Sequence, residues 1–403
     1  MNYQTIDNCV ACGGQNLSQI IDLGYQPLAN DFLPPGTNLE TFPLALNKCD
    51  DCFHGQISIA VNPERMFREY NYVSGTSQTL YEYFEWLREG IFRDHGYEGM
   101  ILDIGSNDGT FLSTFNGTSW TKLGVDPAIN LIREALRLGV ITIPSFFTEK
   151  LSNLLSSKFD VVIALNVFAH TAEPLDILLG IKKCLDENGI AYIQTSQANM
   201  FQDGEFDTVY HEHISFFCVR SMRALLKRAG LSLIDVDLVP IHGTSYLWKI
   251  GHEFRGTKSI AREQDEINVG LYQPEIYNQF RKQVEIRTQE VNLVVEEFRR
   301  KNYIIASYGA AAKGNTFINY AGLRLDYIFD DTVLKIGNLS PAGGCIVSSP
   351  TVMSDLIGPI LIIIPAWNFK KEIIEKIKRL RNNLDDEYLV YYPALERNLV
   401  VNS

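Results

Sequence analysis

Two Cys-x-x-Cys pairs near the start of the chain constrain its fold more than any other feature. Cys9 and Cys12 form the first pair, and Cys49 and Cys52 form the second after 36 intervening residues. Each two-residue spacer makes a tight turn that aims both thiolates at one ion, and two such pairs complete the tetrahedral shell of zinc. Four thiolates leave no open position for water, so we expect a structural zinc site. The alternative, two disulfides, is disfavoured in a cytosolic chain.

Glycines follow both cysteine pairs. Gly13 and Gly14 come after the first pair and Gly55 after the second, and we expect them to supply backbone freedom for the two turns. The zinc-binding domain is predicted to span residues 1–60.

Length and charge set the class of protein. The chain has 403 residues, which suggests two or three domains, and 36 basic against 48 acidic residues give a net charge of −12. An acidic surface disfavours nucleic acid and anionic membranes as partners. The apolar run from Leu356 to Trp367 is too short to span a bilayer, which takes roughly 20 residues, and is predicted to be a buried strand. Met1–Asp7 shows no signal-peptide pattern, so we expect a cytoplasmic location.

From Gly99 onward, short apolar runs alternate with helical stretches, as in a parallel α/β sheet. A turn is expected at Glu187–Gly189, and helices at 175–185 and 221–230. The predicted strands are Met100–Ile104, Lys122–Val125, Phe159–Asn166, Ile190–Thr195 and Leu231–Leu238.

The first of these strands ends in a glycine-containing turn that opens a helix at Thr110. Gly105 and Gly109 let the backbone turn sharply and approach a ligand at the helix N-terminus. The second strand ends in Asp126, 23 residues after Asp103, and a carboxylate at that place can accept both hydroxyls of a ribose. The turn alone is a weak signal because the complete G-x-G-x-x-G pattern is missing.

A connection of about 24 residues separates the strand that ends near Ser196 from the helix predicted to begin at Ser221. Connections this long in a compact sheet usually serve function, and this one leaves the carboxyl edge where ligands bind. It contains Tyr210, His211, Glu212 and His213. Three interpretations compete: the two histidines ligate a metal, they are structural, or an imidazole transfers a proton.

The C-terminal part is predicted to be a second α/β domain behind a long helix over 275–301. The expected strands are 303–307 and 325–329, and the stretch from Gly309 to Gly314 matches neither the phosphate-binding loop of ATPases nor the dinucleotide pattern. Lys313 beside a helix N-terminus is a candidate anchor for a diphosphate. The alternative is a solvated surface lysine.

The central residues resemble a class I S-adenosylmethionine-dependent methyltransferase over about 100–240. The alternative is a dinucleotide-binding Rossmann domain that carries out hydride chemistry. The resemblance rests on the spacing from Asp103 to Gly109, on Asp126, on the strand at 160–166 and on Asn188-Gly189. It implies that the cofactor is S-adenosylmethionine, bound by Asp103, Gly105, Asn107, Asp108, Gly109, Asp126 and Asn166.

The whole chain resembles the nucleotide-sugar C-methyltransferases. The four cysteines, the Glu212-His213 pair and the stretches Tyr308–Lys313 and Ala366–Asn368 carry this resemblance together. It implies a nucleoside-diphosphate-linked 4-keto-6-deoxysugar that is methylated at C3, or at C5 in some relatives. It also implies that His213 is the base and Glu212 its neighbour, with Tyr210 and Tyr72 as active-site phenols.

The resemblance further implies a set of substrate contacts. Ile241–Ser245 is similar to a His-Gly-Gly-Ser stretch of the family, although Thr244 replaces the second glycine. The residues expected to bind the substrate are Tyr72, His242, Gly309, Lys313 and Asn315.

The expected architecture is α/β, with an N-terminal four-cysteine zinc module, a class I methyltransferase Rossmann-like core and a C-terminal Rossmann-like domain. Two other functions compete: an O- or N-methyltransferase for another small molecule, and a zinc-ribbon module for nucleic acid, which the acidic balance disfavours. The oligomeric state is open, a monomer included. The expected borders are 1–60, 61–250, 251–302 and 303–403.

Overall fold

The computed structural model describes residues 2–70, 73–76, 78–196, 199–241, 243–254, 258–381 and 383–400. The chain forms two compact units. The first combines Met1–Gln19, Asn47–Asn199 and Glu212–Tyr272, and the second combines Ile20–Leu46, Met200–His211 and Gln273–Ser403. The borders predicted near residues 60, 250 and 302 stay predictions.

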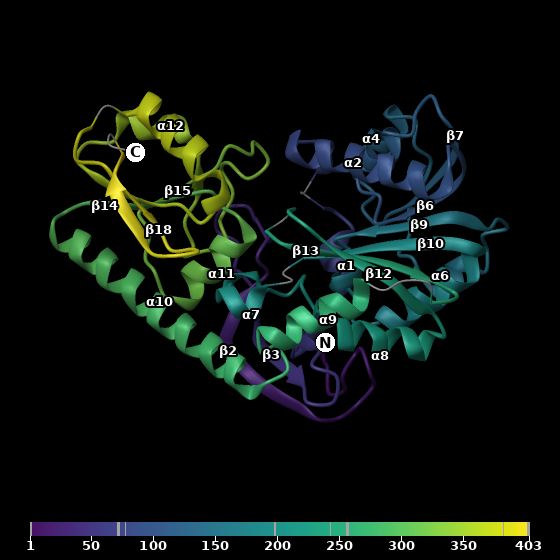
Figure 1. Ribbon diagram of the computed structural model, residues 1–403. Helices are drawn as coiled ribbons and strands as arrows, with labels where there is room; N and C mark the ends of the chain where they lie inside the picture. The colour runs from purple at the N-terminus through teal and green to yellow at the C-terminus, as the bar shows by residue number, and fades with distance from the viewer. Residues whose placement is uncertain are drawn as a thin grey trace. The chain divides into compact units, whose positions relative to one another are not determined.

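A seven-stranded sheet forms the centre of the first unit (Figure 1), in the order β12-β13-β10-β9-β6-β7-β8. The five strands from β10 to β8 are parallel, and β13 is antiparallel to both of its neighbours. The strands are β6 (Glu98–Ile104), β7 (Ser119–Val125), β8 (Thr142–Ile143), β9 (Phe159–Leu165), β10 (Leu185–Thr195), β12 (Ser232–Val239) and β13 (Ser245–Gly251).

Most predicted strands of this sheet are confirmed, with two corrections. The turn predicted at Glu187–Gly189 is wrong, because these residues continue β10 through a register irregularity between Leu185 and Ile190. Gly189 serves close approach at this place, since a Cβ there would lie 2.9 Å from the Phe159 carbonyl oxygen. Strand β13 was not predicted, although Tyr246, Leu247 and Trp248 are residue types that favour strands.

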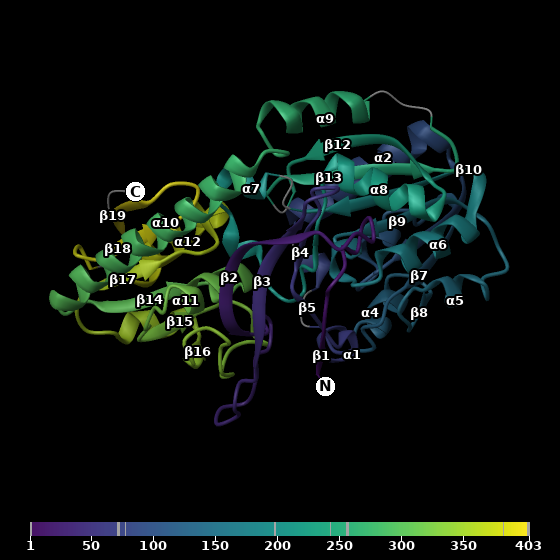
Figure 2. The same ribbon diagram turned by 90° about the horizontal axis from the view of Figure 1, so that it is seen from below.

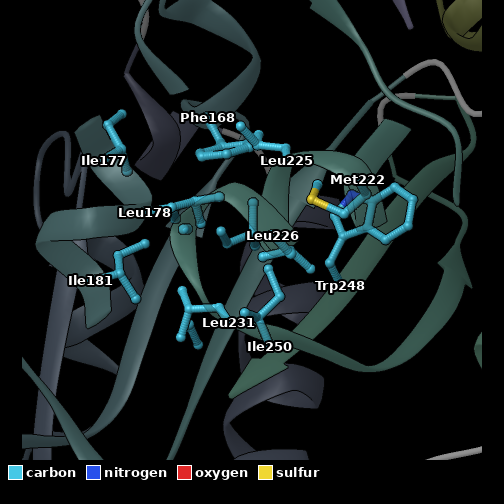
Figure 3. Packing of buried hydrophobic residues seen from close by; sticks show 14 of the residues in the cluster. Phe168, Ile177, Leu178, Ile181, Met222, Leu225, Leu226, Leu231, Trp248 and Ile250 are labelled. Atoms are coloured by element: carbon cyan, nitrogen blue, oxygen red, sulfur yellow. The ribbon is translucent and has the colours of Figure 1, made fainter. Parts of the chain in front are cut away.

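Helices cover both faces of the sheet. Helix α2 (Gln78–His95) and the short helix α3 (Thr110–Ser113) pack on one face, against buried side chains such as Ile101, Ile163 and Tyr192. Helices α6 (Pro174–Cys184) and α8 (Val219–Ala229) pack on the other face, where Leu178, Met222, Leu225 and Trp248 meet (Figure 3). Successive side chains of a strand point to opposite faces of the sheet, so each strand packs against both layers of helices. Each fully buried large aliphatic side chain contributes about 1.5–3 kcal/mol to the free energy of folding.

Smaller elements complete the first unit. Strands β1 and β5 pair antiparallel, and so do β4 and β11. These and the remaining helices are β1 (Tyr3–Thr5), β4 (Gly55–Ile57), β5 (Ile59–Val61), α1 (Pro63–Phe67), α4 (Ile132–Arg137), α5 (Glu149–Ser152), β11 (Ser215–Phe216) and α9 (Lys258–Asn268).

The second unit contains a six-stranded sheet in the order β16-β15-β14-β17-β18-β19 (Figure 2). Its strands are parallel except for β19, which pairs antiparallel with β18. The C-terminal Rossmann-like prediction agrees with this sheet. Its elements are α7 (Met200–Asp203), α10 (Pro274–Arg300), β14 (Ile304–Tyr308), α11 (Ala312–Tyr320), β15 (Tyr327–Phe329), β16 (Val347–Ser348), β17 (Ile360–Ile363), α12 (Lys370–Leu380), β18 (Glu387–Val390) and β19 (Glu396–Leu399).

Two long strands, β2 (Leu17–Pro27) and β3 (Thr41–Cys49), carry the chain from the first unit to the second and back. None of the described helices is both long and apolar enough to cross a membrane.

Candidate functional site

Three residues of the turn after β6 have a left-handed backbone conformation. Gly105, Asn107 and Gly109 have φ of 75°, 51° and 80°. Glycine is required at position 105 for space as well, because a Cβ there would lie 2.5 Å from Cγ2 of Val167. The backbone therefore comes close to the loop that follows β9, as the predicted ligand-binding turn requires.

Asp126, at the end of β7, is tied to this turn. Its Oδ2 accepts from the Asn107 N–H at 2.7 Å and its Oδ1 from the Ala128 N–H at 2.7 Å. The side chain is 6% exposed, and burial raises the pKa of its carboxyl above the ordinary value. Each oxygen keeps a lone pair after these contacts, so the residue fits its predicted role as acceptor for ribose hydroxyls.

Asp103 lies inside the same end of the sheet. It is buried, and burial raises the pKa of its carboxyl well above the ordinary value, with the nearby Asp126 charge as a further cause. A buried carboxyl beside another acid favours a ligand that brings a positive charge. The amino and sulfonium groups of S-adenosylmethionine meet that condition.

Asn107 and Asp108 connect the turn to the start of α2. The Ser74 N–H donates to Asn107 Oδ1 at 3.0 Å, and the Gly75 N–H donates to Asp108 Oδ2 at 3.0 Å. The other Asp108 oxygen accepts from the Thr110 N–H at 3.2 Å, as in an Asx turn. These two side chains thus organise the segment before α2 over the turn.

The Glu212-His213 pair lies just before β11, in the first unit, and both side chains are buried. The Tyr70 hydroxyl donates to Glu212 Oε2 at 3.1 Å. The His213 ring stacks on the ring of His170, with centroids 5.2 Å apart and 27° between the planes. His170 stacks in turn on Phe67 at 5.9 Å.

His170 ends a 3₁₀ helix, η2 (Phe168–His170), in the loop that follows β9. That loop leaves the same sheet edge as the Gly105 turn, because β6 and β9 are parallel neighbours. The cofactor turn, the His170 loop and the Glu212-His213 pair therefore border one region of the first unit.

Sequence reasoning missed both Tyr70 and His170. Tyr70 stands two residues before the predicted Tyr72, and His170 stands in the loop that follows β9. A histidine in a loop at the carboxyl edge was the available signal for His170. Tyr72 and His242 lie outside the described residues.

Tyr210 and His211 belong to the second unit by their contacts. His211 is 1% exposed, its Nε2 donates to the Pro43 carbonyl at 3.3 Å, and its ring meets Phe42 edge-on. Burial lowers the pKa of His211 to about 4. Among the described residues the only cluster of side chains suited to a metal is the four-cysteine one, so the structure gives no support to metal ligation by His211 and His213.

The four cysteines form the zinc site that their spacing predicts. Their sulfurs all lie within 4.8 Å of one another, with 3.5 Å from Cys9 to Cys52 and from Cys12 to Cys49. Tetrahedral ligands at about 2.3 Å from zinc stand about 3.8 Å apart, so this set fits the ion, whereas disulfides need about 2 Å.

The two cysteine turns are alike in shape but not in sequence. Gly13 (φ 81°) and Phe53 (φ 62°) each follow the second cysteine of a pair in the left-handed conformation. The expectation for Gly55 is therefore wrong, since it lies in β4 and the turn uses Phe53. The Phe53 ring packs edge-on against Tyr272 at 5.0 Å, which offsets part of the strain at a non-glycine residue.

The second unit holds the predicted substrate contacts Gly309, Lys313 and Asn315. Gly309 has a φ of 103° at the end of β14, and Asn315 Nδ2 donates to the Ala29 carbonyl at 2.8 Å. Lys313 pairs with Glu205, with 3.3 Å between Nζ and Oε2. Lys313 is thus partly buried and ion-paired in this structure.

Three family models match consecutive parts of the chain. A putative zinc binding domain matches residues 9–67, a methyltransferase domain matches 76–236, and a C-methyltransferase C-terminal domain matches 240–393. C-methyltransferase NovU of Streptomyces niveus is 27% identical over 397 residues, which are 94% of this chain and 94% of that protein.

Other matches cover the central part alone. A tRNA U34 carboxymethyltransferase of Campylobacter jejuni is 29% identical over 109 residues, 24% of this chain and 34% of that protein. The structure of 1,6-didemethyltoxoflavin-N1-methyltransferase of Burkholderia thailandensis, with bound 1,6-didemethyltoxoflavin and S-adenosylhomocysteine, has a TM-score of 0.34 and 18% identity. That match covers 45% of this chain and 80% of that chain.

These findings confirm the resemblance to S-adenosylmethionine-dependent C-methyltransferases with a zinc-binding domain. They also confirm the predicted cofactors, S-adenosylmethionine and zinc.

Proposed function

We propose that this chain, an S-adenosylmethionine-dependent C-methyltransferase by homology, methylates a ring carbon of a nucleoside-diphosphate-linked 4-keto-6-deoxysugar. The carbon we assign is C3, next to the ketone. The observation that carries the proposal is the pair Glu212-His213, with Tyr70 bound to the carboxylate and His170 stacked on the imidazole, in a homologue of a C-methyltransferase.

A carbon acceptor needs a base, because its proton must leave before the carbon can attack. His213 takes the proton from C3, and the electron pair of the C–H bond moves into an enolate over C3, C4 and the keto oxygen. When bound, S-adenosylmethionine supplies the electrophilic methyl group, whose bond to sulfur breaks as the bond to C3 forms. The imidazolium of His213 then returns its proton to solvent.

Other side chains orient the His213 imidazole and stabilise the enolate. Glu212 orients the imidazole and stabilises its positive charge, and Tyr70 fixes Glu212 through the hydroxyl contact. Tyr210 and Tyr72 are the proposed phenols, one of which donates to the enolate oxygen. The proposed cofactor contacts are Asp103, Gly105, Asn107, Asp108, Gly109, Asp126 and Asn166.

Gly309, Lys313 and Asn315 are the proposed contacts of the nucleotide part of the substrate. A diphosphate there replaces Glu205 as the partner of Lys313. Lys313→Ala is therefore expected to raise KM for the nucleotide sugar and to leave cofactor binding unchanged. Lys370→Ala, which breaks the exposed pair with Glu396 in the same unit, is the matched control and should leave KM unchanged.

The test is product analysis with S-adenosylmethionine and a panel of nucleoside-diphosphate 4-ketosugars. We expect a mass gain of one methylene and an NMR signal for a methyl group on carbon. A methyl group on oxygen or nitrogen would place the chain among O- or N-methyltransferases instead. With S-adenosylhomocysteine in place of the methyl donor, C3 should exchange its proton for solvent deuterium, which tests the enolate directly.

A further inference from the structure

A chain of hydrogen-bonded side chains runs from helix α2 through strand β10 to the loop after β9, within the first unit. The Tyr83 hydroxyl on α2 donates to Oε1 of Gln194 at 2.5 Å. Nε2 of Gln194 donates to Oδ1 of Asn166 at 3.0 Å. The Asn166 backbone N–H donates to the Gln194 carbonyl at 3.1 Å, so the two residues are joined twice.

Gln194 is fixed firmly by these contacts. It is fully buried, and a buried amide that lost its partners would cost about 1–3 kcal/mol for each unsatisfied group. Burial also raises the pKa of Tyr83, so its phenol stays a neutral hydroxyl and a donor. Gln194 therefore meets Tyr83 with its oxygen and Asn166 with its nitrogen.

Asn166 takes its orientation from Gln194. Its φ of 56° is left-handed, a conformation that asparagine tolerates better than most residues. Its side-chain oxygen accepts from Gln194 Nε2, so Nδ2 is the side-chain atom that still needs a hydrogen-bond partner. No acceptor for Asn166 Nδ2 is found among the residues that the structure describes.

The loop that Asn166 opens borders the candidate site on two sides. Val167 packs on Gly105 of the cofactor turn, and His170 stacks on His213. Asn166 therefore opens a loop that contacts both the cofactor turn and the ring of His213.

We propose that Gln194, held by Tyr83, is a positioning residue that turns the Asn166 amide so that its N–H donates to an oxygen atom of the bound ligand. The inference rests on one part of the proposed function, the binding of S-adenosylmethionine. The ligand oxygen belongs either to the cofactor or to the acceptor, and two separate measurements distinguish these sources.

The structure offers a matched control between the same two elements. Tyr192 lies two residues before Gln194 on β10 and therefore on the same face of the sheet. Its hydroxyl donates to Asp94 Oδ2 of α2 at 2.9 Å. Tyr83→Phe and Tyr192→Phe thus each delete one phenol hydroxyl between α2 and β10, but only the first deletes a contact of Gln194.

The sharpest variant is Gln194→Glu. The introduced carboxylate still accepts from Tyr83, but it cannot donate to Asn166. The Asn166 amide is then satisfied only by turning its Nδ2 inward, which presents an oxygen to the ligand in place of a donor. Tyr83→Phe keeps the ring and introduces no charge, so it tests the same idea if the first variant folds poorly.

Affinity for S-adenosylhomocysteine by calorimetry and kcat with the nucleotide sugar are measured for each variant. We expect Gln194→Glu to change at least one of them by tenfold or more and Tyr83→Phe to change the same one by about threefold, on the scale of one lost hydrogen bond. Tyr192→Phe should leave both within twofold. A weaker affinity assigns the ligand oxygen to the cofactor, and a lower kcat with unchanged affinity assigns it to the acceptor.

A purely structural role is excluded by a double-mutant comparison. In an Asn166→Ala background, Gln194→Glu should have no further effect, because the amide it turns is gone. Full additivity, or equal effects of Tyr83→Phe and Tyr192→Phe, would overturn the inference. A further outcome separates the two proposals. If the variants change the affinity for S-adenosylhomocysteine as expected but the wild type methylates no carbon, the proposed function fails and this inference stands.

Discussion

At the residue scale, two histidines two positions apart have different chemical surroundings. His211 is enclosed by Phe42 and the Pro43 carbonyl, and with a pKa of about 4 it stays neutral at pH 7. His213 stacks on another imidazole, next to a glutamate that is held by a phenol. The two rings therefore differ in the groups that contact them: a backbone carbonyl for His211 and a second imidazole for His213.

His213→Asn is expected to lower kcat by about 10²–10⁴-fold, the usual contribution of a positioned acid–base group. Affinity for S-adenosylhomocysteine should stay unchanged, because the loss falls on the transition state. Steady-state kinetics and calorimetry check both statements, and deuterium exchange at C3 should disappear as well. Near-wild-type turnover in this variant would remove His213 from the mechanism.

His211 makes folding sensitive to acid. Its folded pKa of about 4 lies below the unfolded value of about 6.5, so the unfolded state binds more protons and stability falls as pH falls through this window. The wild type should therefore lose about 2 kcal/mol more than His211→Gln between pH 7 and pH 5. Urea unfolding at the two pH values measures the difference, and parallel losses would contradict it.

The sequence allowed part of the candidate site to be predicted. The pair Glu212-His213 was found because it lies in a long connection at the carboxyl edge of a recognisable sheet. Tyr70 and His170 were not found, because their relation to that pair arises from tertiary contacts between segments far apart in the chain. Phe53 was missed for another reason. It has a left-handed backbone conformation, which sequence analysis expects of glycine, and its packing against Tyr272 supports that conformation.

At the element scale, periodicity predicted the helices and the parallel strands well. The long helix expected over 275–301 is α10, and the strand expected over 159–166 is β9. Strand β13 escaped prediction because its buried pattern lacks the alternation of a half-exposed strand. Its place between β10 and β12 buries both faces, as it does for the parallel strands.

An acidic side chain from another helix binds the N-terminus of helix α8. Both carboxylate oxygens of Glu266 in α9 accept from the Val219 N–H, at 3.1 and 3.0 Å, and the Tyr246 hydroxyl donates to Glu266 at 2.6 Å. The Tyr272 hydroxyl donates to the same carboxylate. A negative charge at this end also complements the helix dipole.

Glu266→Ala should therefore lower stability by about 2–4 kcal/mol, because three buried donors lose one charged partner. Glu263→Ala is the control on the same helix: Glu263 pairs with Arg220 and Arg223 near the surface, and such pairs contribute about 0–1 kcal/mol. Thermal unfolding of the two variants gives the comparison. Equal losses would mean that the α8 contact is not what Glu266 contributes.

At the scale of the whole molecule, the zinc site joins distant parts of the chain into the first unit. Its ligands come from two segments: Cys9 and Cys12 precede β2, and Cys49 and Cys52 lie at the end of β3 and just after it. The chain between them, Ile20–Leu46, belongs to the second unit. The buried Cys9, Cys49 and Cys52 belong to the same apolar core as Met222 and Leu225 of α8. The Arg228 side chain of α8 also donates to the Ala11 carbonyl at 2.8 Å.

Cys49→Ser should lower zinc content well below one ion per chain and should destabilise more than the N-terminal segment, because the core of α8 loses its support. We expect a lower melting temperature and a lower soluble yield. Cys184→Ser, at a buried cysteine outside the four-cysteine cluster, is the control and should keep its zinc.

Four thiolates leave no open coordination position, so the Cys49→Ser protein that remains folded should bind S-adenosylhomocysteine with near-wild-type affinity. Elemental analysis, thermal unfolding and calorimetry test the three statements, and a strong loss of affinity in well-folded protein would assign the zinc a part in cofactor binding.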